Sequence, residues 1–226
     1  MRSVINRTKI NWLSAAAGFR ESSTECSPAR REFRVVPREY GKLSSLSGRE
    51  FLISGANELM ESKAKLMGRL TESHQQIEQL VPRVDQNLEI YPGWTIGAIL
   101  AHFTGWDNAV IVSLNTLAAG GVPTVVAEGD HDLYNLTTVT EREALRFEQI
   151  FQDWQNNHEQ LKIAILNLPP EKMEAQFVFP WGQVGNIEDL VIGLTAGHEV
   201  YHMQDIQALL DKIETSDQKL SSSSHK

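Results

Sequence analysis

Hydrophobic residues recur every three or four positions along four stretches of the chain, with polar residues between them. A helix turns once in 3.6 residues, so this spacing places the hydrophobic side chains on one face and predicts amphipathic helices. The four predicted helices cover about residues 58–81, 96–119, 141–168 and 187–214. The aromatic segment 177–182 is interpreted as a short connector with locally extended backbone. The pattern therefore predicts an all-α protein, a four-helix bundle.

Capping residues support the ends of these helices. Thr95 and Asn186 each precede a helix and carry a side-chain oxygen that can accept a hydrogen bond from its first free backbone amides. Thr140 and Glu143 match the capping-box pattern, which predicts that the third helix begins there. Gly120, the first of two consecutive glycines, is typical of the residue that ends a helix. Local signals therefore bound the helices that the hydrophobic spacing predicts.

Residues 119–139 separate the second and third helices and are too long for a tight helix–helix turn, which usually takes about two to eight residues. A segment of this length can run along the whole bundle. The second and third helices are therefore predicted to be parallel and joined by a crossover. Trp106 in the second helix, Tyr134 in the crossover and Trp181 in the aromatic connector are predicted to line a substrate pocket, although ordinary packing or an ordinary loop would also explain them.

Length and composition favour one domain with tails. The chain has 226 residues, of which 41% are hydrophobic, enough for a single core of ordinary size. We predict a disordered N-terminal extension over residues 1–57, because this part is rich in serine and arginine and has no sustained period. The bundle is predicted over residues 58–214, and residues 215–226 form a polar tail predicted to be disordered.

Charge and cysteine content narrow the range of functions. The formal net charge of -8 combines +4 in residues 1–59 with -12 in residues 60–226. An acidic main body argues against nucleic acid as a partner, because phosphates are bound by basic surfaces. No apolar run approaches the ~20 residues needed to span a membrane. The lone Cys26 excludes an internal disulfide and fits a reducing compartment, so we expect a cytoplasmic protein.

Two histidines four residues apart are the strongest chemical signal. His198 and His202 would lie on the same inward face of the fourth helix, where their ring nitrogens could share one metal ion. His102 lies on the buried face of the second helix and is our predicted third ligand. The alternative is that each ring is a core histidine with a hydrogen-bonding partner, which is the interpretation preferred for His74 and His158.

The segment His198–His202 also matches the H-E-x-x-H pattern of zinc metallopeptidases, in which the glutamate, here Glu199, is the general base. Those enzymes usually take a third metal ligand from downstream, either a histidine in an H-x-x-G-x-x-H extension or a glutamate about one helix later. Neither pattern follows His202 here. Glu199 is therefore a candidate catalytic residue, with Asp205 and Asp107 as weaker candidates for orienting an imidazole or accepting a proton. A further alternative is a bundle that binds a small ligand or a partner without catalysis.

The chain resembles the DinB-like (DinB/YfiT) superfamily of metal-binding four-helix bundles. The residues that carry the resemblance are Gly93–Thr95, Leu100–Trp106, Pro180–Gly182 and Ala196–Ile206. The resemblance covers about residues 60–213. It implies a bundle with a crossover between the second and third helices and a divalent ion held by three histidines. Characterised members include transferases that use low-molecular-weight thiols, a thiol-dependent isomerase and, more distantly, a hydrolase, and many members have no known activity.

Three imidazoles would leave open positions on a Zn²⁺, Ni²⁺ or Fe²⁺ ion, which is typical of a catalytic rather than a structural site. Such an ion lowers the pKa of a bound water or thiol and makes it a nucleophile near neutral pH. We therefore expect a divalent-metal-dependent enzyme that acts on a small electrophilic substrate, with a low-molecular-weight thiol as a further cofactor. A homodimer that forms through an exposed helix face is compatible with the sequence.

Overall fold

The computed structural model describes the backbone of residues 48–223 and the side chains of residues 57–195 and 197–219. The chain divides into two units, residues 1–62 and 63–226. Of the first unit, the structure describes the beginning of one helix, so most of the predicted N-terminal extension lies outside the described residues.

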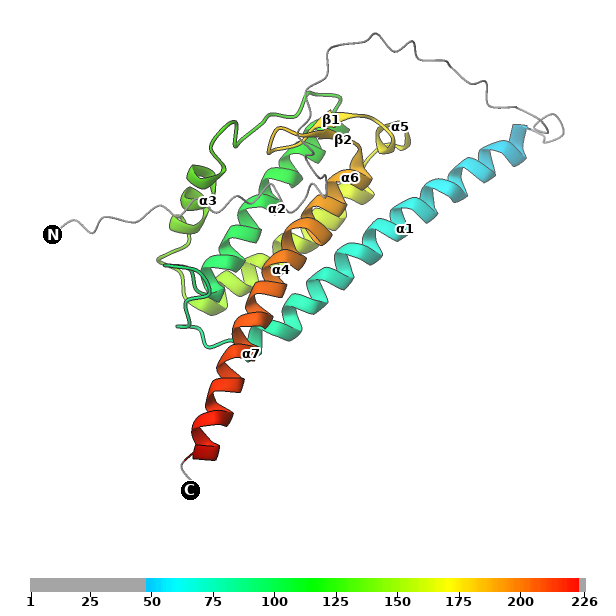
Figure 1. The fold of residues 1–226 in the computed structure, drawn as a ribbon. Coiled ribbons are helices and arrows are strands. Elements are labelled where there is room, and N and C mark those ends of the chain that lie inside the picture. The colour runs from blue at the N-terminus through cyan, green and yellow to red at the C-terminus, as the bar shows by residue number, and fades with distance from the viewer. Residues whose placement is uncertain (1–47, 224–226) are drawn as a thin grey trace, which may run out of the picture. The chain divides into compact units, whose positions relative to one another are not determined.

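Helices dominate the described chain, as the hydrophobic spacing predicts (Figure 1). The long helices are α1 (Gly48–Leu80), α2 (Ile96–Ala118), α4 (Phe147–Leu166) and a last helical segment, which consists of α6 (Ile187–Ile192), η2 (Gly193–Glu199) and α7 (Val200–Ser223). The prediction of four long helices is therefore confirmed. The sequence places the start of the first helix at about residue 58, whereas α1 already begins at Gly48.

Contacts between α2 and α4 show that these helices are parallel. Near the start of both, Gly97 faces the side chains of Phe147 and Ile150. Further along both, the Asn157 side-chain amide donates a hydrogen bond to the Thr104 carbonyl oxygen at 3.0 Å. Residue numbers therefore rise together along the two helices, and the predicted crossover between them is confirmed.

The last helical segment lies parallel to α1 and antiparallel to α2. Lys65 forms an ion pair with Glu188 at 3.0 Å, and Arg83 donates a hydrogen bond to Gln207 at 2.9 Å, so numbers rise together along this pair. On the side of α2, His102 contacts His198. Tyr91, which precedes α2, contacts His202 and Asp205, so residue numbers fall along α2 as they rise along the last helical segment.

The crossover contains a helix that the sequence interpretation lacks, α3 (His131–Thr140). The Asp130 side chain caps it by accepting a hydrogen bond from the Leu133 amide at 2.9 Å. The prediction that Thr140 and Glu143 begin the next helix is wrong, because Thr140 is the last residue of α3 and an N-cap needs extended backbone. The chain instead turns, and α4 starts at Phe147.

The other predicted caps hold their positions. Asn186 accepts a hydrogen bond from the Asp189 amide at 3.0 Å, and Asp189 accepts one from the Asn186 amide at 3.1 Å, so the start of α6 is closed from both sides. Thr95 has the extended backbone of an N-cap, but its side chain makes no capping hydrogen bond. The predicted capping contact is therefore present at Asn186 and missing at Thr95.

Short elements connect the long helices. The remaining elements are η1 (Val81–Arg83), α5 (Pro170–Met173), β1 (Phe177–Val178) and β2 (Val184–Gly185). The strands pair antiparallel, with Phe177 opposite Gly185 and Val178 opposite Val184. Between them, Gly182 adopts a φ of 91°, a conformation that glycine tolerates best. The aromatic connector predicted from the sequence is thus a small hairpin.

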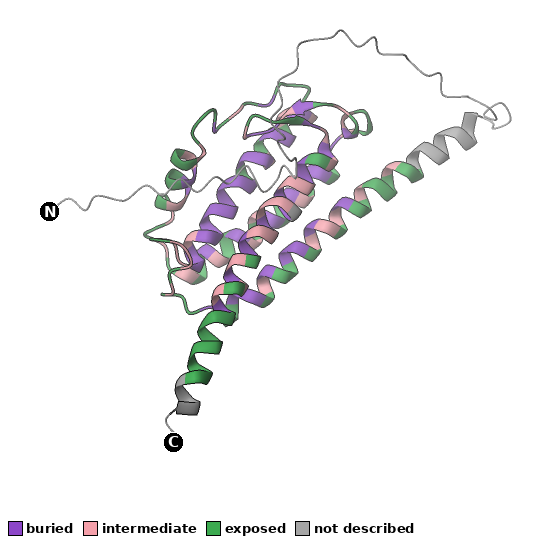
Figure 2. Cartoon of the chain, viewed as in Figure 1, coloured by how far each residue is buried: buried purple, intermediate pink, exposed green. Residues whose placement is uncertain are grey.

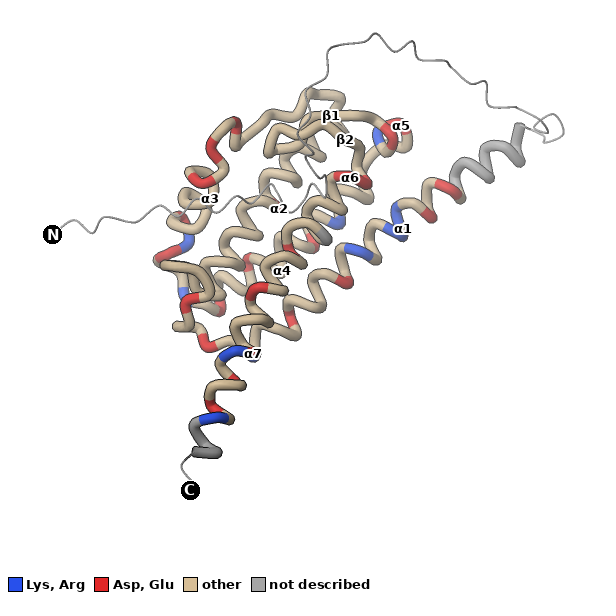
Figure 3. Tube along the Cα trace, viewed as in Figure 1, with Lys and Arg blue, Asp and Glu red and all other residues tan. Residues whose placement is uncertain are grey.

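Burial follows the predicted stripes, with buried side chains on the faces between helices (Figure 2). Trp154, Leu100 and Leu190 are 0% exposed and mark the centre of the core. Helix α7 continues to Ser223, where the sequence predicted a disordered tail from residue 215, and the side chains of residues 211–219 are all exposed. Acidic residues are scattered along the described part of the chain, and the fewer basic residues there do not form a continuous run (Figure 3). No described helix is long and apolar enough to cross a membrane.

Candidate metal centre

Three histidines from two helices converge inside the bundle. His102 comes from α2, His198 from η2 and His202 from the first turn of α7. One ring nitrogen from each lies within 4.8 Å of the others, and the His102 and His198 Nε2 atoms are 2.7 Å apart. Among the described residues, this is the one group of three or more histidine, cysteine or acidic side chains placed to hold a metal ion.

The donor set fits a divalent ion such as zinc. Zinc–nitrogen bonds of about 2.0–2.1 Å in a tetrahedron place two ligand nitrogens about 3.3 Å apart. In the structure one pair of nitrogens is 2.7 Å apart and no pair is more than 4.8 Å apart, so all three lie near that spacing. Small shifts of the imidazoles would therefore suffice for coordination, and three ligands leave an open position.

The backbone at His198 is a π-helix, not the α-helix that the spacing predicts. The π-helical residues are Gly193–Glu199, and ordinary α-helix resumes at Val200. A π-helical turn holds more residues than an α-helical turn and changes the direction in which the following side chains point. His198 and His202 nevertheless stay close, with ring centroids 5.0 Å apart. Short π-helical segments inside α-helices are frequent at functional sites.

Burial keeps the three imidazoles neutral. His102 and His202 are 2% and 0% exposed, and loss of hydration lowers the pKa of each well below the ordinary histidine value. The neighbouring histidines lower both values further. Burial also lowers the pKa of His198 to about 4, although part of this side chain reaches the surface. Neutral imidazoles are the form that binds a metal, so the site is ready for one at neutral pH.

Asn135 links helix α3 to His102. Its side-chain oxygen accepts a hydrogen bond from the Trp106 indole at 3.0 Å, and a hydrogen bond with His102 raises the pKa of that imidazole against the larger effect of burial. Asn135 is 4% exposed. The close approach of α3 depends on Gly105, because a Cβ there would lie 2.6 Å from the Thr138 side chain.

Tyr91 is a site residue that the sequence analysis missed. Its hydroxyl lies 3.0 Å from Nδ1 of His202 and donates a hydrogen bond to Asp205 at 2.8 Å. Tyr91 lies in a turn, in which the Tyr91 and Trp94 backbones bond to each other and Gly93 has a φ of 79°. Asp205, a weaker sequence candidate, does reach the surroundings of the histidines.

The three predicted substrate-binding residues lie together. The Trp106 ring is the centre, 4.6 Å from the Tyr134 ring and 5.9 Å from the Trp181 ring, measured between centroids. The Tyr134 hydroxyl donates a hydrogen bond to the Gly105 carbonyl oxygen at 2.8 Å. Since Trp106 shares Asn135 with His102, this aromatic cluster adjoins the metal centre. Its role in binding a substrate stays a prediction.

Glu199 is engaged by residues of other helices. It is 4% exposed and accepts a hydrogen bond from the Ser73 hydroxyl of α1. Asp107 of α2, 3% exposed, lies close enough to act on it electrostatically. Burial raises the pKa of both carboxyls, and the negative charge of Asp107 raises that of Glu199 further. Whether Glu199 takes part in catalysis is untested and stays a prediction.

His74 and His158 pack in the core, as predicted. The His74 ring stacks between Trp154 and His158, with centroids 4.0 Å from each. His158 is 0% exposed, and burial lowers its pKa to about 3. Both rings lie outside the group formed by His102, His198 and His202.

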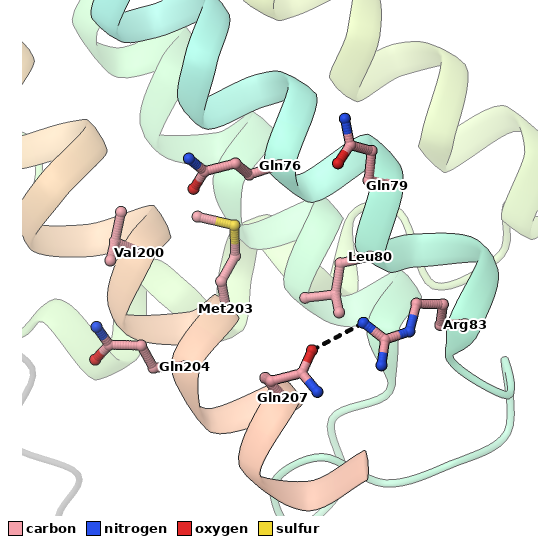
Figure 4. A pocket seen from close by; sticks show the side chains of 8 residues that line it. All are labelled: Gln76, Gln79, Leu80, Arg83, Val200, Met203, Gln204 and Gln207. Atoms are coloured by element: carbon pink, nitrogen blue, oxygen red, sulfur yellow. Dashed lines mark hydrogen bonds between the residues drawn. The ribbon is translucent and has the colours of Figure 1, made fainter. Parts of the chain in front are cut away.

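An open groove of about 340 Å³ lies between α1 and α7 (Figure 4). Four glutamines surround its apolar floor, and Arg83 donates a hydrogen bond to Gln207 across it. Met203 lines the groove, but the three histidines do not. The groove is therefore distinct from the metal centre.

Comparison with known proteins identifies the fold. No family model matches the chain, and neither does any curated protein. Two matching solved structures are the mycothiol-dependent maleylpyruvate isomerase and a histidine-to-alanine mutant of it. Each has 11% sequence identity and a TM-score of 0.54, and each match covers 64% of this chain and 60% of the isomerase chain. The isomerase has the DinB-like fold, which confirms the predicted fold class.

Proposed function

We propose that this chain is a divalent-metal-dependent enzyme of the DinB-like superfamily, which transfers a small thiol to a small electrophilic substrate or otherwise acts on it. The observation that carries the proposal is the convergence of His102, His198 and His202 from two helices of the bundle. The similarity in fold to a mycothiol-dependent isomerase supports a thiol as the second cofactor. The identity of the metal, zinc, nickel or iron, is left to experiment.

In this proposal, different residues of the chain would bind the metal and the substrate. His102, His198 and His202 would hold the ion, and their burial keeps them unprotonated. A bound divalent ion supplies positive charge that stabilises the anionic form of a coordinated thiol or water. Trp106 and Trp181 would provide apolar surface for the substrate beside it.

The peptidase alternative fits less well. In an H-E-x-x-H peptidase the glutamate is the general base at the metal. Here Glu199 is hydrogen-bonded to Ser73 on another helix, and the third histidine, His102, comes from upstream instead of downstream. The described β-structure is a hairpin of two short strands and offers little edge for an extended peptide.

The sequence also suggests the class of substrate, the cellular location and the kinds of partner. We propose a small molecule as substrate, a cytoplasmic location, and neither nucleic acid nor membrane as a partner, because residues 60–226 carry a net charge of -12 and the lone Cys26 fits a reducing compartment. A homodimer remains compatible with this proposal.

Elemental analysis of the purified full-length protein is the first test. We expect near-stoichiometric divalent metal in the parent and its loss in His102→Ala and His202→Ala, each checked for folding by circular dichroism. His74→Gln is the matched control, because it changes a buried histidine outside the metal group and should retain the metal. An absence of metal in the parent, even after refilling with zinc, nickel or iron, would refute the proposal.

Activity is tested next on the metal-loaded protein. Mycothiol and other low-molecular-weight thiols are combined with maleylpyruvate and with reactive electrophiles, and we expect conversion that needs the thiol and is lost in His102→Ala. Retained metal without conversion would favour the non-catalytic bundle, and cleavage of casein would favour the peptidase.

A further inference from the structure

A short chain of hydrogen bonds runs from His202 through Tyr91 to Asp205. The Tyr91 oxygen lies 3.0 Å from Nδ1 of His202 and 2.8 Å from Oδ2 of Asp205. We propose that Tyr91 and Asp205 are positioning residues, which hold the proton of neutral His202 on Nδ1 and so direct its Nε2 lone pair toward the metal. This inference rests on the proposed function in treating His202 as a ligand.

Counting protons gives the direction of each bond. A tyrosine hydroxyl has a single proton to donate, and a carboxylate can only accept. Tyr91 donates that proton to Asp205, so its oxygen is the acceptor in the contact with His202. The donor in that contact is then Nδ1–H of the imidazole. A neutral imidazole has one N–H, which leaves Nε2 as the nitrogen with the lone pair.

The surrounding structure keeps this chain of bonds in place. Asp205 follows His202 by three residues on α7, so both side chains lie on the same side of one helix. Tyr91 is held from the opposite direction by its backbone bonds to Trp94, just before α2 begins.

Such partners matter because they fix a ligand before the metal arrives. Hydrogen bonds to the second ring nitrogen of a metal-binding histidine commonly set its tautomer, and their loss costs about 10–100-fold in metal affinity. His202 is 0% exposed, so water has little access to replace a lost partner. Tyr91→Phe keeps the ring and its packing while it removes the hydroxyl, which makes it the informative substitution.

The tautomer can be read directly in the metal-free, full-length protein. With ¹⁵N-labelled histidine, long-range ¹H–¹⁵N spectra distinguish Nδ1–H from Nε2–H, and the His202 signals are assigned by their loss in His202→Ala. We expect Nδ1–H in the parent and a mixture of tautomers in Tyr91→Phe. In Asp205→Ala the Tyr91 proton has lost its acceptor and should turn to Nδ1, which shifts His202 to the Nε2–H tautomer.

His74 serves as an internal control, because its ring lies outside the three-histidine group and its Nε2 is 3.3 Å from Glu78, so its tautomer should stay the same in both variants. Zinc affinity, measured by competition with a chelator, should fall about 10–100-fold in Tyr91→Phe. Nε2–H at His202 in the parent, or a tautomer that neither substitution changes, would overturn the inference. If the parent bound no metal, the proposed function would fail, and the spectra of the metal-free protein would still decide the inference.

Discussion

At Gly105 the side chain of Thr138 in helix α3 lies close against α2, and replacement of this glycine by alanine is the sharpest test of the packing around the site. The added Cβ would lie 2.6 Å from both Cβ and Cγ2 of Thr138. Ordinary contacts begin near 3.4 Å, so α3 would have to withdraw by about 1 Å. That shift pulls on the hydrogen bonds of Tyr134 and Asn135, which join α3 to α2.

Two effects oppose each other in Gly105→Ala. Alanine favours a helix over glycine by about 1 kcal/mol, whereas overpacking in a tight contact costs about 1–3 kcal/mol. Strained hydrogen bonds at Asn135 and Tyr134 add to the cost. We therefore expect the free energy of unfolding to fall by on the order of 2 kcal/mol, measured by urea denaturation followed by circular dichroism.

Gly68 in α1 provides the matched control, because it is an exposed helical glycine and no described heavy atom lies within 4 Å of an added Cβ. Gly68→Ala should raise the free energy of unfolding by up to about 1 kcal/mol. Adding Thr138→Gly to Gly105→Ala removes the Thr138 atoms that the added Cβ would approach. The double variant should therefore lose less free energy of unfolding than the two single variants lose when their losses are added. If Gly105→Ala were as stable as Gly68→Ala, the close approach of α3 would be refuted.

Three further predictions concern buried polar groups. Burial raises the pKa of Asp107 to about 7 and of Glu199 to about 8, so both carboxyls of the folded protein keep protons that the unfolded chain releases near pH 4. Above pH 4 this difference favours the unfolded chain. In urea denaturation, Glu199→Gln should therefore raise the free energy of unfolding at pH 8 by on the order of 2 kcal/mol and have little effect near pH 4. Burial lowers the pKa of His198 to about 4, so as the pH falls from about 6.5 the unfolded chain binds a proton at this residue before the folded protein does. The metal-free parent should therefore lose stability between about pH 6.5 and pH 4, and His198→Gln should reduce that loss. Trp106→Phe leaves the Asn135 oxygen without its indole donor and should cost about 1–3 kcal/mol in the same assay, whereas a cost near zero would refute a buried role for that bond.

The long helices and the three histidines could be predicted because each depends on a local pattern. Helical hydrophobic spacing determines which side chains turn inward, and His102 and His202 lie within those stripes. The length of residues 119–139 was enough to predict parallel helices, since a chain that crosses the bundle needs such a segment. These are inferences about which face a residue occupies, and tertiary packing preserved them.

Helix α3 and Tyr91 could not be predicted in the same way, because their reasons lie in residues distant in sequence. The exposed Leu133 and Leu136 blur the hydrophobic stripe of α3, and its buried side chains Asn135 and Thr138 are polar. Asn135 is buried because it satisfies the Trp106 indole of another helix. A polar residue buried by its partner leaves no hydrophobic signal, so pattern analysis assigns it to a loop.

The π-helical segment at residues 193–199 shows that the predicted convergence of the histidines occurs with a backbone geometry that the sequence did not predict. The i, i+4 spacing predicted His198 and His202 on one face of an α-helix, yet the backbone at His198 is π-helical and becomes α-helical at Val200. An ordinary α-helix through residues 187–214 would turn His198 differently relative to Leu190, which the core fixes at 0% exposure. The structure has to bury one face of α6 and also bring His198 to His102. The π-helical turn between them allows both, because α6 keeps its buried face and the Nε2 atoms of His198 and His102 are 2.7 Å apart. The site therefore depends on a backbone irregularity that becomes necessary only once the positions of α2 and the core are set.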